Sequence, residues 1–267
     1  MRLPYSLILC LFALLATRAS AQKEFADWYF SGSNKLSFQN NNIAEFKTDF
    51  LTNGTYWWNF KDAGTSGVGY NDPVTGELKF IVSNVLTYDK NGDLMLDAPL
   101  IRCCPGDKQA IHIIPFQNNP NRFYIIQNQD PSGAILAAQI GLQVRCPNPI
   151  GLAYSILDLT LNNGKGGYIE SNKVLWGGVT SRIAIVRHAN GKDTWIVSHP
   201  ASGGTYNAFL VTDAGIQNPV VSTAGPNLNY SFEDVQTNII VSHDGKKMLG
   251  FRNGRLELYD FIPQREK

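Results

Sequence analysis

The stretch that decides the fold is Arg187–Asp213, RHANGKDTWIVSHPASGGTYNAFLVTD. It contains a polar turn at Ala189–Asp193, an apolar run at Thr194–Ser198, a glycine-rich link, and a second apolar run at Tyr206–Thr212 that closes on Asp213. Turn residues between short β-branched and aromatic runs are typical of antiparallel strands joined in a meander. The stretch therefore predicts β-sheet.

The same unit recurs along the chain. Its first half is a turn followed by an apolar strand, found at Pro73–Ser83, Asn119–Ile126, Asn190–Ser198 and Asp244–Phe251. Its second half is a strand that ends in aspartate, found at Tyr88-Asp89, Leu157-Asp158, Thr212-Asp213 and Tyr259-Asp260. The equivalent turn residues Gly76, Asn121, Gly191 and Gly245 lie about 45 to 70 residues apart, a spacing that indicates the blades of a β-propeller.

We therefore expect an all-β, β-propeller-like fold with about four recognisable blades, to which residues 25–60 add a partial fifth. A β-sandwich is the alternative, and it would show no radial repetition. The last unit, Arg255–Ile262, is followed by too few residues for a fourth strand. The segment around Trp28–Phe38 or another chain must supply that strand. We expect the open, incomplete (truncated) propeller, which would self-associate through its open blade edge.

Composition and charge limit the class of protein. The 267 residues are 43% hydrophobic and 17% charged, with a net charge of +1, as in a globular protein. There is no basic run, so a nucleic-acid partner is not expected. Residues 1–21 combine Arg2, an apolar centre and a small-residue end, which predicts a secretory signal peptide. We expect no transmembrane segment, and an exported protein in the periplasm, on the cell surface or outside the cell.

One domain, residues 22–267, is expected after the leader, with a Cys-bounded insertion around residues 103–149. Three cysteines remain in the mature chain: Cys103, Cys104 and Cys146. Export makes a disulfide the expected state, and adjacent cysteines do not bond to each other in relaxed geometry. Cys146 is therefore expected to pair with Cys103 or Cys104. A zinc site is the alternative, although the sequence lacks a CxxC pair and a nearby histidine cluster.

Signatures of catalysis and of cofactor binding are missing from the sequence. It contains no nucleophile elbow, zinc-protease helix or phosphate-binding loop before a helix. Gly164-Lys165-Gly166-Gly167 is interpreted as a hairpin turn, and no cofactor is expected. Asp89–Asp93 imitates part of a calcium loop without its bidentate glutamate, and a polar turn explains the same residues.

Binding residues are suggested by two groups of side chains. His188 and His199 bracket one strand that also contains Trp195, and the sequence predicts that both histidines are strand-end or turn residues. A binding site of His188, Trp195 and His199 on one rim is the alternative. The aromatic run Thr55–Phe60 predicts core packing, with a carbohydrate-stacking surface as the alternative.

With these residues in view, the chain resembles the propeller-like N-terminal region of secreted Bacteroidetes proteins associated with gliding motility and type IX secretion. The resemblance covers nearly all of the mature chain, and the His188–His199 segment is its most specific part. It rests on Trp28-Tyr29-Phe30, on Leu78 and Phe80 after Gly76, on Tyr154–Asp158, on Gly164–Gly167, on His188-x-Asn-Gly-x-Asp-x-Trp-Ile-Val-x-His199, and on Ser242-x-Asp-Gly-Lys246.

The resemblance implies a secreted, non-catalytic binding or scaffold module of the cell envelope or surface, with a protein or a glycan as its partner. Members of the family continue through further blades into a C-terminal sorting domain, whereas this sequence stops at Lys267. We therefore expect a short or truncated member. The alternative function is a carbohydrate-active propeller enzyme resembling a glycoside hydrolase, because propellers can hold paired carboxylates around a central cleft.

Overall fold

The computed structural model describes residues 27–30, 34–40, 43–47, 68–83, 86–95, 111–129, 151–177, 180–200, 203–228, 239–242, 244–252 and 255–261. Several predictions lie outside these residues. They are the signal peptide, the disulfide of Cys146 with Cys103 or Cys104, the parts of the insertion at residues 103–110 and 130–149, and the aromatic run Thr55–Phe60. The middle of the predicted insertion, residues 111–129, is described and forms two regular strands of a sheet.

The described residues form five antiparallel sheets, in which consecutive strands pair with one exception in sheet 4. Sheet 1 contains β1 (Asp27–Phe30), β2 (Asn34–Asn40) and β3 (Ile43–Lys47), and sheet 2 contains β4 (Val68–Asn71), β5 (Leu78–Val82) and β6 (Thr87–Asp89). Sheet 3 contains β7 (Ile111–Pro115), β8 (Arg122–Gln129), β9 (Gly151–Asp158) and β10 (Gly167–Trp176). Sheet 4 contains β11 (Thr180–Arg187), β12 (Thr194–Pro200), β13 (Gly203–Thr212), β14 (Gly215–Ile216) and β15 (Val220–Leu228), of which β15 pairs with β13. Sheet 5 contains β16 (Ile239–Val241), β17 (Lys247–Arg252) and β18 (Arg255–Asp260).

The all-β prediction is confirmed for the described residues. Their only helix is the single turn α4 (Leu161–Gly164), which connects β9 to β10. The predicted turn at Gly164–Gly167 is this connection, although its helical turn was not expected. No helix within the described stretches is long and apolar enough to cross a membrane.

The strand order also confirms the repeat. In sheets 2 to 5, the turn and apolar strand of each unit form the first turn and the second strand. The half that ends in aspartate forms the third strand. Asp89, Asp158 and Asp260 are the last residues of β6, β9 and β18, and Asp213 directly follows β13. The five sheets are not the two layers of a β-sandwich.

The turns before β5, β12 and β17 share one construction. Gly76, Gly191 and Gly245 have φ angles of 79°, 70° and 68°, which residues with a Cβ rarely adopt. In each turn a side-chain oxygen accepts hydrogen bonds from backbone N–H groups. The accepting residues are Asp72, Asn190 and Asp244. Local turn chemistry therefore explains why these residues recur.

Asp72 provides a test of this turn chemistry. The N–H groups of Thr75 and Val74 donate to its carboxylate, and with Lys79 at 3.2 Å they lower its pKa to about 2. The pKa of Asp72 is lower in the folded state than in the unfolded chain, where it is about 3.9. The ionised carboxylate therefore stabilises the fold above about pH 3.9, and this contribution is lost as the pH falls towards 2.

We expect Asp72→Asn to lower the free energy of unfolding at pH 7 by about 1 kcal/mol, after allowance for solvent screening. The stabilities of the wild type and of the variant should converge between pH 4 and pH 2. Urea denaturation at several pH values measures this difference. A constant difference across the series would contradict the assignment.

The sheets pack face to face in sequence order. Tyr70, Phe80 and Phe123 join sheet 2 to sheet 3, with the Phe123 ring centroid 4.7 Å from Tyr70 and 4.8 Å from Phe80. Ile126, Leu152, Ile196 and Phe209 belong to the core between sheets 3 and 4. Val197, Tyr206, Ile239 and Met248 belong to the core between sheets 4 and 5. Sheets 3 and 4 are therefore buried on both faces.

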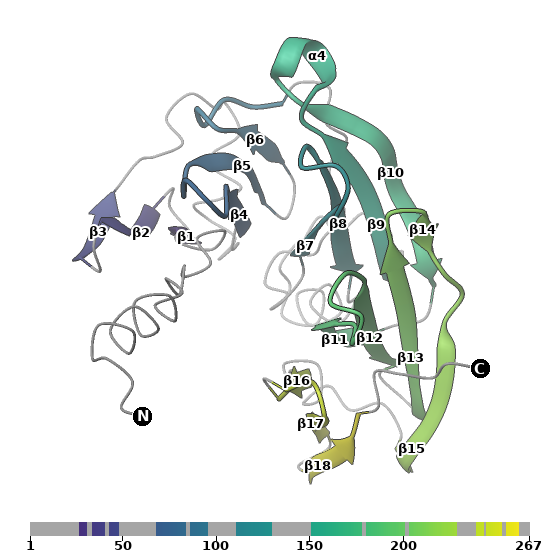
Figure 1. The fold of residues 1–267 in the computed structure, drawn as a ribbon. Helices are drawn as coiled ribbons and strands as arrows, with labels where there is room; N and C mark the ends of the chain where they lie inside the picture. The colour runs from purple at the N-terminus through teal and green to yellow at the C-terminus, as the bar shows by residue number, and fades with distance from the viewer. Residues whose placement is uncertain are drawn as a thin grey trace, which may run out of the picture.

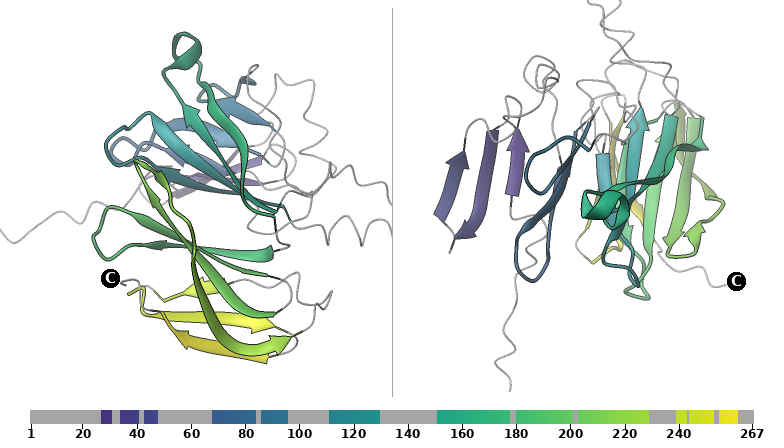
Figure 2. Two further views of the ribbon diagram at one scale, coloured as in Figure 1. Left: turned by 90° about the vertical axis from the view of Figure 1, so that its right-hand side faces the viewer. Right: turned by 90° about the horizontal axis from the view of Figure 1, so that it is seen from above.

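The sheets follow one another along an arc, with sheets 1 and 5 on either side of its opening (Figure 1). Neighbouring sheets meet through their first or second strands, namely β1 with β4, β4 with β7, β8 with β11, and β11 with β16. In the left view of Figure 2, sheets 3, 4 and 5 lie one below the other. β1 contains Trp28–Phe30, β2 contains Asn34–Phe38, and β2 pairs with both β1 and β3. In the described strands, the N-terminal segment is therefore not the partner of β18.

Candidate functional site

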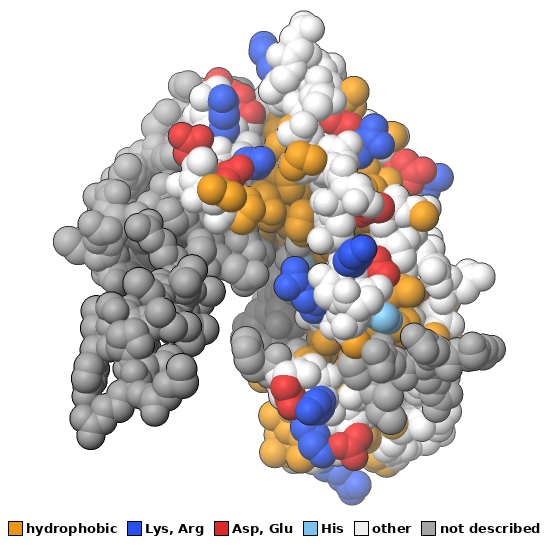
Figure 3. Space-filling view, in the orientation of Figure 1, with side chains coloured by type: hydrophobic (Ala, Val, Ile, Leu, Met, Phe, Trp, Pro, Cys, Tyr) orange, Lys and Arg blue, Asp and Glu red, His pale blue; other side chains and the backbone are white. Residues whose placement is uncertain are grey.

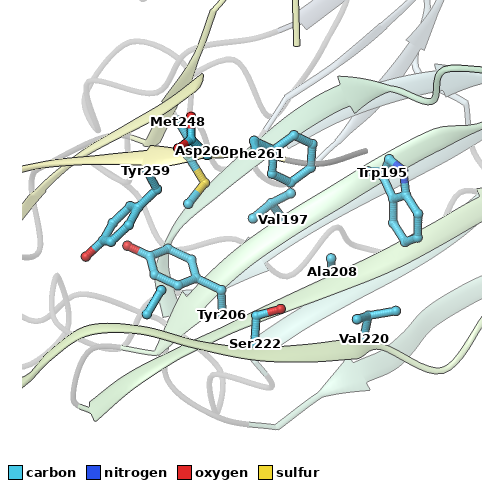
Figure 4. Close-up of a pocket in the computed structure, with 11 residues that line it drawn as sticks. Trp195, Val197, Tyr206, Ala208, Val220, Ser222, Met248, Tyr259, Asp260 and Phe261 are labelled. Atoms are coloured by element: carbon cyan, nitrogen blue, oxygen red, sulfur yellow. The ribbon is translucent and has the colours of Figure 1, made fainter. Parts of the chain in front are cut away.

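A groove of about 190 Å³ lies between sheets 4 and 5. One wall is the face of β12, β13 and β15, and the other is formed by β17, β18 and the residue that follows. In Figure 4, Tyr206, Tyr259 and Met248 lie at one end of the groove and Trp195 lies at the other. The lining is mainly apolar and comprises Trp195, Val197, Tyr206, Ala208, Val220, Ser222, Ala224, Met248, Tyr259, Asp260 and Phe261.

The tyrosine end of the groove is tightly packed. The rings of Tyr206 and Tyr259 meet edge to face with their centroids 5.5 Å apart. The hydroxyl of Tyr259 donates to Oε2 of the buried Glu257 at 2.9 Å. Desolvation, the bond to Glu257 and the neighbouring Tyr206 all raise the pKa of Tyr259. Gly225 of β15 lies against the same hydroxyl, because a Cβ there would come within 2.0 Å of Tyr259 Oη.

Within the described strands, the groove opens where sheet 5 lacks the strand that sheets 3 and 4 have beside their third strand. On the outer side of the third strand, sheet 2 has a bridge between Tyr88 and Leu94, sheet 3 has β10, and sheet 4 has β15. Among the described residues, nothing pairs with the outer side of β18. Val220, Ser222 and Ala224 of β15 therefore line a groove that a fourth strand of sheet 5 would cover.

The backbone of β18 presents hydrogen-bonding groups at this open side. Phe261 N–H donates to Lys246 O at 2.7 Å, and β18 pairs with β17 in antiparallel register. Hydrogen-bonded pairs alternate along an antiparallel ladder, so Tyr259 and Glu257 also face β17. The N–H and C=O groups of Leu256, Leu258 and Asp260 then point to the open side. β18 is a sheet edge of the kind that accepts another strand.

The structure brings His188 and Trp195 of the alternative rim site together but places His199 apart from them. His188 lies in the turn before β12, where its Nδ1 accepts from Asn190 N–H at 3.0 Å and its ring lies 5.6 Å from Trp195. His199 lies near the other end of β12, where it is buried and packs edge to face on Tyr206 at 4.4 Å. The two histidines are separated because β12 runs between them. Trp195 lines the groove, and the two histidines are absent from its lining.

The aspartates that end the third strands have structural partners. Asp213 accepts from the N–H groups of Gln117 and Asn118 at 2.8 and 2.7 Å, which links sheet 4 to the first turn of sheet 3. Asp158 accepts from Thr160 and from Arg122, and these bonds lower its pKa against the opposing effect of desolvation. Asp260 pairs with Lys247. A glycoside hydrolase needs a carboxylic acid with a raised pKa beside a second carboxylate. Asp158 does not meet this requirement.

The turn Asp89–Asp93 is held by hydrogen bonds within the turn. The carboxylate of Asp89 accepts from the N–H groups of Asn91 and Asp93 at 2.8 and 3.0 Å, as in a polar turn. Within the described stretches, no three His, Cys, Asp or Glu side chains are grouped to hold a metal ion.

Most of the groove was not predicted from the sequence. The sequence pointed to Trp195 and to the missing fourth strand of the last unit, but it gave no reason to expect that β15 lies beside them. The sequence signal for β15 was the uncharged run Val220–Ala224, which follows the third strand of its sheet. On a strand, the side chains of this run point alternately to the two faces of the sheet.

Comparison with known proteins gives distant likenesses only. No protein-family model matches the chain, and no curated protein matches it. Among solved structures, a gluconolactonase from Xanthomonas campestris is 9% identical, with 88% of this chain and 71% of that chain covered and a TM-score of 0.35. An exo-β-1,3-galactanase from Phanerochaete chrysosporium, solved with β-1,3-galactotriose, is 10% identical, with 71% and 41% covered and a TM-score of 0.32. At these scores the likeness supports no inference about function.

Proposed function

We propose that this chain is an exported, propeller-like binding module that recognises an extended segment of a protein partner by adding it as a fourth strand beside β18. The observation that supports this function is the open side of β18 next to an unfilled apolar groove. Strand addition is a common mode of peptide recognition, in which backbone hydrogen bonds give affinity and pockets for alternate side chains give specificity.

The repeat and the packing of the sheets support the propeller-like part of the proposal. Sheets 2 to 5 share the order of turn, second strand and third strand, and neighbouring sheets pack face to face along an arc. The expected export rests on the leader predicted in residues 1–21. A role in binding at the cell envelope agrees with the propeller-like packing and with the predicted export.

The groove defines the chemistry of the segment. β18 spans Arg255–Asp260, so the partner segment has about six residues in β conformation. Its alternate side chains enter a space bounded by Trp195, Val220, Met248 and Phe261, which favours β-branched or aromatic residues. No charged side chain is needed at those positions.

A phage-displayed library of twelve-residue peptides panned on the purified protein tests this proposal. The selected peptides should show apolar residues at every second position. Leu258→Pro removes an N–H group that points to the open side, so we expect it to weaken binding by at least about tenfold. The matched control Leu258→Ala keeps that N–H group and should bind within about threefold of the wild type.

Trp195→Ala shortens a side chain that lines the groove and should also weaken peptide binding by about tenfold. Circular dichroism verifies that each variant is folded. Peptides without the alternating pattern, or equal binding by wild type and Leu258→Pro, would contradict strand addition. Release of reducing ends from a panel of oligosaccharides by the wild type, lost in Trp195→Ala, would instead support the carbohydrate-active alternative.

A further inference from the structure

The outer face of sheet 5 exposes a continuous set of apolar side chains. Ile240, Leu249 and Leu258 lie directly opposite one another on β16, β17 and β18, and Phe251 lies opposite Leu256. Strand alternation places all five on one face of the sheet. Ile240, Phe251, Leu256 and Leu258 are 57%, 42%, 69% and 65% exposed.

The other face of the same sheet is buried. Ile239, Met248 and Glu257 are nearly inaccessible, and the first two belong to the core shared with sheet 4. Sheets 3 and 4 are covered on both faces by their neighbours. The outer face of sheet 5 therefore corresponds to the faces through which the other sheets pack against their neighbours along the arc. Hydrophobic side chains gather over this sheet at the lower end of the molecule, between basic and acidic ones (Figure 3).

We infer that this apolar face packs against the same face of a second copy of the chain, forming a symmetric dimer. Contiguous exposed apolar patches of a few hundred Å² on soluble proteins commonly mark interaction sites. In a two-fold dimer each copy supplies the same face, so an apolar sheet on an apolar sheet is self-complementary.

The charges around the face favour a second copy over a partner of opposite charge. Lys247 pairs with Asp260, and Lys246 lies 3.9 Å from Asp244, so these two cations are balanced by anions of the same sheet. The five face residues are uncharged, and the whole chain carries a net charge of only +1. Two copies therefore approach with little repulsion, and nothing on the face selects a strongly charged partner. This inference concerns the face of sheet 5 and does not rest on strand addition at the edge of β18.

Sedimentation equilibrium of the purified protein tests the dimer over concentrations on the order of 1 to 100 µM. The wild type should pass from monomer to dimer within this range. Leu256→Glu and Ile240→Lys each place a charge in the face and should raise the dissociation constant at least about tenfold. The matched control Val174→Glu changes an exposed apolar residue of β10 and should leave the equilibrium unchanged.

A monomer at every concentration would overturn the inference and indicate that another protein or another segment of this chain covers the face. A dimer that survives Leu256→Glu and Ile240→Lys but is lost in Leu258→Pro would also overturn it, because the copies would then pair through the edge of β18. Circular dichroism of both face variants should match that of the wild type, since these side chains are exposed.

Discussion

Replacing Phe123 by alanine is expected to lower the free energy of unfolding by about 3–5 kcal/mol. Phe123 is completely buried and contacts Tyr70 and Phe80 of the preceding sheet. The substitution removes two aromatic pairs and leaves a cavity between sheets 2 and 3. The large effect follows from the face-to-face packing of these two sheets.

Urea denaturation at low protein concentration measures this effect. The matched control is Phe251→Ala, in which a phenylalanine that is 42% exposed on the outer face of sheet 5 is shortened. We expect the control to cost less than about 1 kcal/mol. Similar losses from the two variants would show that Phe123 does not join the sheets as described.

Replacing Gly225 by alanine is expected to cost about 2–4 kcal/mol. Gly225 has a φ of 77°, and an added Cβ would lie 2.0 Å from the hydroxyl oxygen of Tyr259. Tyr259 would have to move away and lose its hydrogen bond to the buried Glu257. The strained backbone and the lost bond add to each other, and the tyrosine end of the groove is disturbed.

Two comparisons separate these contributions. Gly191 has a similar φ of 70° but open space around its added Cβ, so Gly191→Ala should show the backbone strain alone, about 1 kcal/mol. Tyr259→Phe removes the atom that clashes. In that background, Gly225→Ala should therefore cost at least about 1 kcal/mol less than in the wild type. Additive losses would place Tyr259 away from β15.

The repeating half of each sheet could be predicted from the sequence because its signals are local. Gly191 and Gly245 supply positive φ, and Asn190 and Asp244 supply oxygens that accept backbone N–H groups within a few residues. The apolar strands that follow alternate clearly enough to be recognised. These features need no knowledge of distant contacts.

The candidate site could not be predicted in the same way because it depends on contacts between distant residues. Trp195 and Val220 face the same groove only because β15 returns to pair with β13 and sheet 5 then packs over both. His188 and His199 appear as a pair along the sequence, yet a whole strand separates them in space. The outer strand β15 carries no repeated turn signal, so its role became visible only in the structure.

Amide hydrogen exchange along β18, measured residue by residue with and without a selected peptide, directly tests strand addition at this edge. The peptide should slow exchange at Leu256, Leu258 and Asp260 by at least about tenfold. Glu257 and Tyr259, which already face β17, should change little. Protection confined to Glu257 and Tyr259, or to strands outside sheet 5, would contradict strand addition at this edge.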